Sequence, residues 1–135
     1  MTDTLGTVEH YDLIILGTGS GNSIINSDFD GWKIAIVEKG VFGGTCLNRG
    51  CIPSKMFVYA ADVIEQARHS AKLGVDLSVD AIRWEDIVDR VFNRIDPIAA
   101  GGEEYRQSLD HVTVYKEHAR FTGPKSVQVG DAEIS

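Results

Sequence analysis

Apolar residues form two short continuous runs near the start of the chain, Leu13–Leu16 and residues 33–37. Runs of this length are typical of strands that are buried on both faces of a sheet. Between them lie a glycine-rich turn, residues 17–22, and a brief helix around Ile24 and Ile25. Because strand, turn, helix and strand follow in this order, the pattern predicts a β-α-β unit with parallel strands.

Two amphipathic patterns occupy the middle of the chain. The first is predicted to be a helix that starts at Pro53, packs one face on a core, runs to about Lys72 and ends at Gly74. The second is predicted to be kinked or ended by Pro97 and interrupted by Gly101–Gly102 before about Leu109. The apolar positions that define the two patterns are Met56, Tyr59, Ala60, Val63, Ile64 and Ala67, and then Trp84, Ile87, Val88, Val91, Ile95 and Ile98.

The last quarter of the chain has the pattern of four short strands. Residues 112–115 are predicted to form a third strand of the parallel sheet. Residues 119–121, 126–129 and 132–134 are extended pieces separated by glycine-containing turns, which indicates an antiparallel meander. The predicted fold is therefore of the α/β class, with a parallel sheet and a β-meander, after a loose leader over residues 1–10.

Composition limits the function classes. The chain has 135 residues, one domain's length, and its 43% apolar and 24% charged residues are ordinary for a globular protein. Its formal net charge of −7 argues against nucleic acid or an anionic membrane surface as a partner. The start lacks the features of a signal peptide, and no window approaches eighteen apolar residues, so the cytoplasm is the expected location.

The chain has only two cysteines, Cys46 and Cys51, both within the segment GGTCLNRGCIPSK. A disulfide needs Cα atoms within roughly 4.4–6.8 Å, so this pair can bond only across a turn or a distorted helical entry, which Gly50 permits. If Pro53 is the first helical residue, Cys51 lies near the positive end of the helix. Helix N-termini favour thiolates, the nucleophiles of disulfide exchange.

A structural disulfide and a zinc site are both disfavoured as roles for the cysteine pair. A structural disulfide would gain little from closing so short a loop, and nothing indicates secretion. A zinc site would need two further ligands at the usual spacing, and none lies near, so no metal is predicted. In a reducing compartment, a disulfide that forms is more often catalytic or sensing than structural. The pair therefore predicts a redox role.

The glycine turn fits the opening of a dinucleotide-binding fingerprint. Gly17 is placed for the tight turn and Gly19 for close approach to a pyrophosphate, while Glu38, 21 residues after Gly17, can accept hydrogen bonds from a ribose. Asn22 stands where the third glycine of the pattern is expected, so the first helix is predicted to be short or further from the sheet. The alternative to a nucleotide site stays open: the glycines can be ordinary turn residues, and Glu38 can be a solvated charge at the end of a strand.

Taken together, the glycine turn, the acid that follows it and the segment GGTCLNRGCIPSK resemble the FAD-dependent pyridine nucleotide-disulfide oxidoreductases, the family of glutathione reductase and dihydrolipoamide dehydrogenase. The resemblance is strong over residues 11–55 and weaker beyond. It implies a Rossmann-like FAD-binding domain that is incomplete in this chain, with residues 1–135 as its N-terminal part. The NAD(P)-binding and dimerisation domains of the family are expected to be absent from the chain.

The resemblance also implies roles for individual residues. Cys51 would be the thiol next to the flavin and Cys46 the interchange thiol that attacks the substrate disulfide. The residues implied to bind FAD are Gly17, Gly19, Ser20 and Gly21 at the pyrophosphate, Glu38 at the ribose, Lys39, Gly44 and Thr45 beside them, Lys55 near the flavin's reactive edge and Ala119 at the adenine.

The implied activity is NADPH-dependent reduction of a small disulfide substrate by a homodimeric full-length protein. The NADPH site would lie outside this chain, which we expect to be inactive alone. Within the family, a glutathione reductase-like or dihydrolipoamide dehydrogenase-like enzyme remains an alternative. A free-standing flavin-binding or redox-sensing module without turnover is the alternative from a different class of function.

Overall fold

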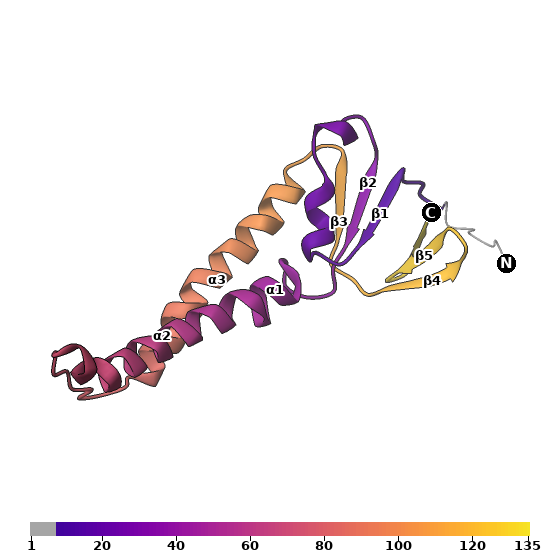
Figure 1. The fold of residues 1–135 in the computed structure, drawn as a ribbon. Coiled ribbons are helices and arrows are strands. Elements are labelled where there is room, and N and C mark those ends of the chain that lie inside the picture. The colour runs from indigo at the N-terminus through magenta and orange to yellow at the C-terminus, as the bar shows by residue number, and fades with distance from the viewer. Residues whose placement is uncertain (1–7) are drawn as a thin grey trace.

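The computed structural model describes residues 8–135, so most of the leader predicted over residues 1–10 lies outside the described residues. Two small sheets lie together at one end of the molecule, and a pair of long helices projects from them as an arm (Figure 1). The arm is formed by α2 (Cys51–His69) and α3 (Trp84–Gln107). The model mixes helices with a parallel sheet, so the predicted α/β class is confirmed.

The first sheet consists of three parallel strands in the order β1-β2-β3. The strands are β1 (Leu13–Leu16), β2 (Ile34–Val37) and β3 (Val112–Tyr115). All three were predicted from their apolar runs, with β2 starting one residue later than expected. The reason is local: the Lys33 N–H donates to the side chain of Asp12 at 2.7 Å.

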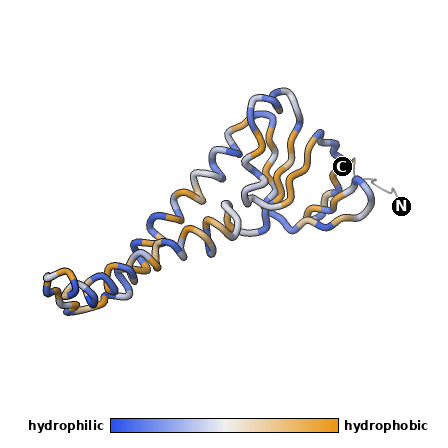
Figure 2. The backbone as a smooth tube through the Cα atoms, in the orientation of Figure 1, coloured by the Kyte–Doolittle hydropathy of each residue, from blue (hydrophilic) through white to orange (hydrophobic). Residues whose placement is uncertain are grey.

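Strand β2 divides the apolar core into two parts. Its four residues are at most 3% exposed, and their side chains alternate between the faces of the sheet. Ile34 and Ile36 pack with Phe42 on the helical side. Ala35 and Val37 pack against the second sheet. Figure 2 shows hydrophobic residues concentrated along these central strands.

The second sheet is the predicted antiparallel meander. It consists of β4 (Ala119–Gly123), β5 (Ser126–Val129) and β6 (Ala132–Ile134) in that order. Gly130 has φ +57° in the last turn, a conformation that favours glycine. The buried side chains of Val127, Val129 and Ile134 cover the face of the parallel sheet opposite the helices.

The link between β1 and β2 contains two 3-10 helices, η1 (Ser20–Ile24) and η2 (Ser27–Phe29). This agrees with the prediction of a brief helix at this place. The side chain of Asn26 caps η2 by accepting a hydrogen bond from the Asp28 N–H at 2.8 Å. The glycine turn is therefore followed by only five residues of helical backbone.

The cysteine segment forms two helices that meet at Gly50. The first is α1 (Gly44–Arg49), and α2 follows it from Cys51. The predicted start of α2 at Pro53 is wrong by two residues, because helical hydrogen bonding already begins with Ser54 N–H donating to Gly50 O at 3.0 Å. Proline is tolerated at the third helical position because the first N–H groups of a helix have no partner within it.

Pro97 does not end α3 and Gly101–Gly102 do not interrupt it, so the predicted end at Pro97 and the predicted interruption are wrong. The helix is continuous in Figure 1. Its buried residues Val91, Ile95 and Ala99 lie on both sides of Pro97, so packing holds the helix together across the missing hydrogen bond. Tertiary contacts override local propensity here.

The apolar face predicted for α2 is not packed on a core. Only Pro53 of this helix is buried, whereas the side chains of Tyr59 and Val63 are 67% and 53% exposed. The helix packs instead along α3, and after η3 (Ser70–Leu73) the chain turns at Gly74, φ +75°, as predicted. Within residues 8–135, no helix is both long and apolar enough to cross a membrane.

Candidate functional site

The glycine turn leaves β1 through a left-handed residue. Gly17 has φ +89°, and its N–H donates to Val37 O at 2.8 Å, which ties the turn to the end of β2. Thr18 follows and is 3% exposed, whereas Gly19 is exposed. The turn thus offers an exposed glycine backbone at the end of a buried strand, as a phosphate-binding loop requires.

Glu38 directly follows β2 and is held by three hydrogen bonds. Its Oε2 atom accepts from the N–H of Thr18 at 3.0 Å and from the Thr18 hydroxyl at 2.8 Å. Its Oε1 atom accepts from the Gly40 N–H at 2.8 Å. Thr18 Oγ1 in turn accepts from the Gly43 N–H at 3.1 Å. The hydroxyl therefore joins the glycine turn, Glu38 and the loop that leads to the cysteines.

The Glu38 carboxyl is ionised more easily than usual. Burial raises its pKa, but the hydrogen bonds from Gly40 and Thr18, together with the charge of Lys116, outweigh burial and bring the pKa below the ordinary value of 4.5. The group is therefore a carboxylate at neutral pH. A carboxylate offers about four acceptor positions, so the three hydrogen bonds leave about one for a further donor.

A hollow of about 190 Å³ lies over the end of the parallel sheet. Four residues predicted for the dinucleotide site share its lining: Gly17, Glu38, Lys39 and Ala119. Ala119 starts β4, and the others lie at the ends of β1 and β2, so residues far apart in the sequence meet at one edge. His118 also lines this hollow.

Gly44 lies against the glycine turn. A Cβ atom placed on Gly44 would be 2.6 Å from the Cα of Gly19 and 3.0 Å from its nitrogen, and the φ of Gly44 is +63°. Only glycine fits such an approach of backbone to backbone. Gly44 is also the first residue of α1, so the helix that carries Cys46 begins in contact with the glycine turn.

Gly50 permits the sharp change of direction between the two cysteines. A Cβ atom there would lie 2.9 Å from the carbonyl oxygen of Thr45 and 3.3 Å from the Cα of Cys46. The backbone at Gly50 therefore lies directly against Thr45 and Cys46 of α1. Cys46 lies in α1 and Cys51 opens α2, and both are exposed, free thiols.

The two thiols affect one another. The pKa of Cys46 is raised, chiefly by its interaction with the side chain of Cys51, then by desolvation and by the charge that Cys51 carries when ionised. The first residue of α2 is Cys51, so its sulfur is at the helix end that the sequence predicted. Both thiols are exposed, one in each of the two helices that meet at Gly50.

The remaining predicted residues are not gathered into the hollow over the sheet. Ser20 and Gly21 are exposed within η1, and Thr45 is exposed in the first turn of α1. Lys55 is exposed one turn after Cys51 in α2. These four residues lie on the elements that border the glycine turn and the cysteine pair.

Three residues of the site were not singled out from the sequence. Thr18 bridges Glu38 and Gly43, as described above. Lys116 donates from Nζ to Gly40 O at 3.0 Å and to Glu103 Oε2 at 2.7 Å, which fixes the loop after Glu38. Asn48 donates from Nδ2 to Phe42 O at 2.8 Å. A threonine, a lysine and an asparagine at these positions carry no spacing signal, because their partners are distant in the sequence or are backbone atoms.

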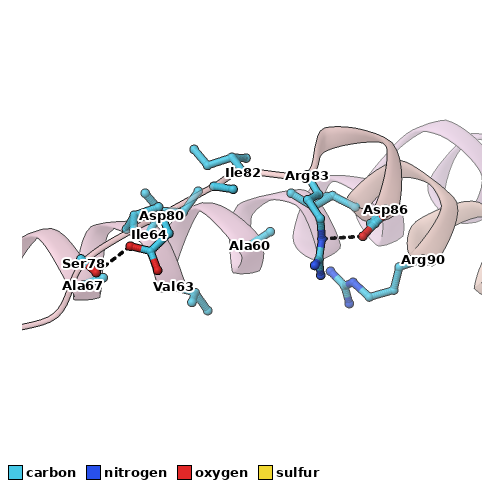
Figure 3. A pocket seen from close by; sticks show the side chains of 13 residues that line it. Ala60, Val63, Ile64, Ala67, Ser78, Asp80, Ile82, Arg83, Asp86 and Arg90 are labelled. Atoms are coloured by element: carbon cyan, nitrogen blue, oxygen red, sulfur yellow. Dashed lines mark hydrogen bonds and ion pairs between the residues drawn. The ribbon is translucent and has the colours of Figure 1, made fainter.

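A larger hollow, about 640 Å³, lies on the arm rather than at this site. Figure 3 shows its lining residues, among them Ala60 and Ile64 of α2, and the ion pair of Arg83 Nε with Asp86 Oδ2 at 2.6 Å. It contains neither cysteine and none of the predicted binding residues. In the described part of the chain, no three His, Cys, Asp or Glu residues are grouped to hold a metal ion.

The chain is similar to two kinds of curated protein. It is 54% identical over 117 residues, 87% of its length, to mycothione reductase of Mycobacterium tuberculosis. It is 36% identical over 116 residues to dihydrolipoyl dehydrogenase of Bacillus subtilis and 35% identical over 125 residues to that of Staphylococcus aureus, 84% and 89% of its length. The resemblance derived from the glycine turn and the cysteine segment is therefore confirmed.

The chain spans about a quarter of the length of these relatives, 24–26% of each. No family model matches the chain. In the relatives, the similarity thus concerns one part of a longer protein.

Proposed function

We infer that this chain is part of an FAD-dependent oxidoreductase of the pyridine nucleotide-disulfide class, in which it holds the flavin and the redox-active cysteines. The observation that carries this proposal is the contact of Gly44 with Gly19, because it places the cysteine segment directly against the candidate dinucleotide loop. A structural cysteine pair would not require that neighbourhood. The 54% identity to mycothione reductase supports the same assignment.

We propose residues 1–135 as the N-terminal part of a Rossmann-like FAD-binding domain, with the NAD(P)-binding and dimerisation domains of the full-length protein outside it. The parallel sheet, the meander and the short glycine turn support the Rossmann-like assignment. The cytoplasm remains the proposed location, because a cysteine pair that cycles between thiols and disulfide suits a reducing compartment.

The residues at the hollow fit the adenosine end of FAD. Gly17 and Gly19 offer backbone to the pyrophosphate, Glu38 retains about one acceptor position for a ribose hydroxyl, and Ala119 borders the space for the adenine. Lys39 supplies a positive charge at the rim. When bound, FAD supplies the two-electron chemistry that links a nicotinamide to the cysteine pair.

The chain's own residues perform the thiol steps. In the dithiol form, Cys46 loses its proton and attacks one sulfur of a small disulfide, which forms a mixed disulfide and releases the first substrate thiolate, which is then protonated. Cys51 loses its proton and attacks the Cys46 sulfur, the second substrate thiolate leaves and is protonated, and the pair is left as a disulfide. Because the pKa of Cys46 is raised, this attack requires a base that takes its proton.

The experiment is reconstitution of the 135-residue chain with FAD, followed by gel filtration, absorbance spectra and a thiol count. We expect bound flavin, and on reduction a long-wavelength absorbance band that is lost in Cys51→Ser and kept in Cys46→Ser. A folded, colourless protein with a titratable thiol pair would overturn flavin binding and favour the redox-sensing module. A chain whose thiols never oxidise would overturn both.

We propose mycothione as the substrate and NADPH as the reductant of the full-length protein. The support is the difference in identity, 54% to mycothione reductase against 36% and 35% to the dihydrolipoyl dehydrogenases. The test is a comparison of kcat/KM for mycothione, glutathione disulfide and lipoamide with each nicotinamide nucleotide. A preference for lipoamide with NADH would favour the alternative, a dihydrolipoamide dehydrogenase-like enzyme.

We also propose that the full-length protein is a homodimer. Several large apolar side chains are exposed on the arm and in the segment that joins its helices, and exposed apolar patches of this kind usually meet a partner. They include Tyr59, Val63, Leu73, Leu77 and Trp84. Sedimentation of the full-length protein as a monomer would contradict this proposal.

A further inference from the structure

Helix α1 is too short to hold its own position. It has six residues, none of them buried, and no side chain caps its N-terminus. Helices of this length are unstable alone, so contacts with the rest of the protein must place it. At its first residue, Gly44 lies against Gly19. The other end of α1, which leads to Gly50 and Cys51, needs a contact of its own.

Asn48 supplies that contact. Its Nδ2 atom donates to Phe42 O at 2.8 Å and lies 3.4 Å from Val41 O. The acceptor is firmly placed, because the side chain of Phe42 is 1% exposed and packs with Ile34 and Ile36. Asn48 is thus the α1 side chain that is hydrogen-bonded to the loop before the helix.

Cys51 lies in a different helix from Cys46. It opens α2, whose Pro53 is buried and which packs along α3. Cys46 lies in α1, two residues before Asn48. The position of one sulfur relative to the other therefore depends on how α1 is oriented, and Asn48 hydrogen-bonds α1 to the backbone of the buried Phe42.

We propose that Asn48 is a positioning residue that sets how readily Cys46 and Cys51 form their disulfide. This rests on the proposed redox role of the pair. When the disulfide forms, each thiol loses a proton and the pair loses two electrons. An external disulfide, here oxidised dithiothreitol, breaks its S–S bond and takes up those two protons and two electrons.

The test is the equilibrium of the full 135-residue chain with reduced and oxidised dithiothreitol, read by alkylation and mass spectrometry without flavin. We expect Asn48→Ala to lower the equilibrium constant for disulfide formation by on the order of threefold to tenfold, because effective concentration depends steeply on alignment. A tenfold change corresponds to about 30 mV for a two-electron couple. Asn48→Asp, similar in shape but without the amide donor, should shift it in the same direction.

The matched control is Asn26→Ala, which removes one side-chain hydrogen bond to backbone in η2, away from the thiols. A purely structural residue would lower the free energy of unfolding of oxidised and reduced chains equally and leave the equilibrium constant unchanged. That result for Asn48→Ala, or failure of both Asn48 variants to fold, overturns the proposal. A wild-type chain that forms no disulfide overturns the proposed function as well. If the chain binds no FAD but Asn48→Ala still lowers the equilibrium constant for disulfide formation, flavin binding is overturned and this inference stands.

Discussion

Gly44 and Gly19 pack backbone to backbone, 25 residues apart in the sequence, with no room between them for a side chain. The contact joins the first residue of α1 to the turn that follows β1. It makes the candidate dinucleotide loop and the cysteine segment one structural unit. A change at either glycine therefore acts on both parts of the site.

Gly44→Ala is expected to destabilise the chain by about 2 kcal/mol or more, because the new methyl group meets backbone and the residue must keep a positive φ. Urea denaturation measures the change. The control is Gly101→Ala in α3, where nothing lies within 4 Å of the new Cβ, and there we expect stabilisation of about 0.5–1 kcal/mol. Equal effects of the two substitutions would show that the Gly44–Gly19 contact is unimportant.

Thr18→Val should cost about 1–3 kcal/mol, because it removes the hydroxyl that donates to Glu38 and accepts from Gly43, leaving partly buried partners without it. Thr18→Ser keeps the hydroxyl and is expected to lose much less. Free energies of unfolding from urea titration compare the two. If valine and serine are equally tolerated, the hydroxyl bridge does not stabilise the site.

Acid should weaken the contribution of the Glu38 carboxylate to the stability of the folded chain. Its pKa in the folded chain is lowered below the ordinary value of 4.5, so its contribution is fully present above that value and is lost as the pH falls through the folded-state pKa. Glu38→Gln should therefore have a lower free energy of unfolding than wild type at neutral pH, and this difference should become smaller in acid. Unfolding at both pH values measures the difference, and Glu104→Gln on α3 is the control. A difference independent of pH would contradict the prediction.

Pro97→Ala should stabilise the chain, by about 1–3 kcal/mol, because alanine restores the N–H that α3 lacks at an exposed position of a continuous helix. Thermal and urea denaturation measure the effect. A loss of stability would mean that Pro97 itself is needed for the packing of Val91 and Ile95.

Strands β1 and β2 could be predicted because each is a short apolar run that ends at a turn, and the central strand β2 is buried on both faces. Pro97 misled the prediction because burial of residues on both sides of it outweighs one lost hydrogen bond. The exposure of α2 could not be foreseen either. An apolar stripe indicates that a helix has a partner, but not whether the partner is a core or a single neighbouring helix.

The site divides in a similar way. Gly17, Glu38 and the cysteines belong to a spaced motif, so the sequence alone pointed to them. Thr18 and Asn48 act through contacts with Gly43 and Phe42 whose geometry depends on the folded chain. No periodicity or spacing distinguishes such residues from ordinary loop residues.

The influence of Cys51 on Cys46 gives a last prediction. The pKa of Cys46 is raised chiefly by its interaction with the Cys51 side chain, so Cys51→Ala should lower it and make Cys46 react with iodoacetamide at a lower pH than in the reduced wild-type chain. Alkylation rates measured across pH and assigned by mass spectrometry give the midpoints. The control is Ser54→Ala, which changes α2 one turn after Cys51 and leaves both thiols in place. An unchanged midpoint in Cys51→Ala would mean that the two sulfurs do not interact in the reduced chain. That result would contradict the close pairing of the thiols on which disulfide exchange depends.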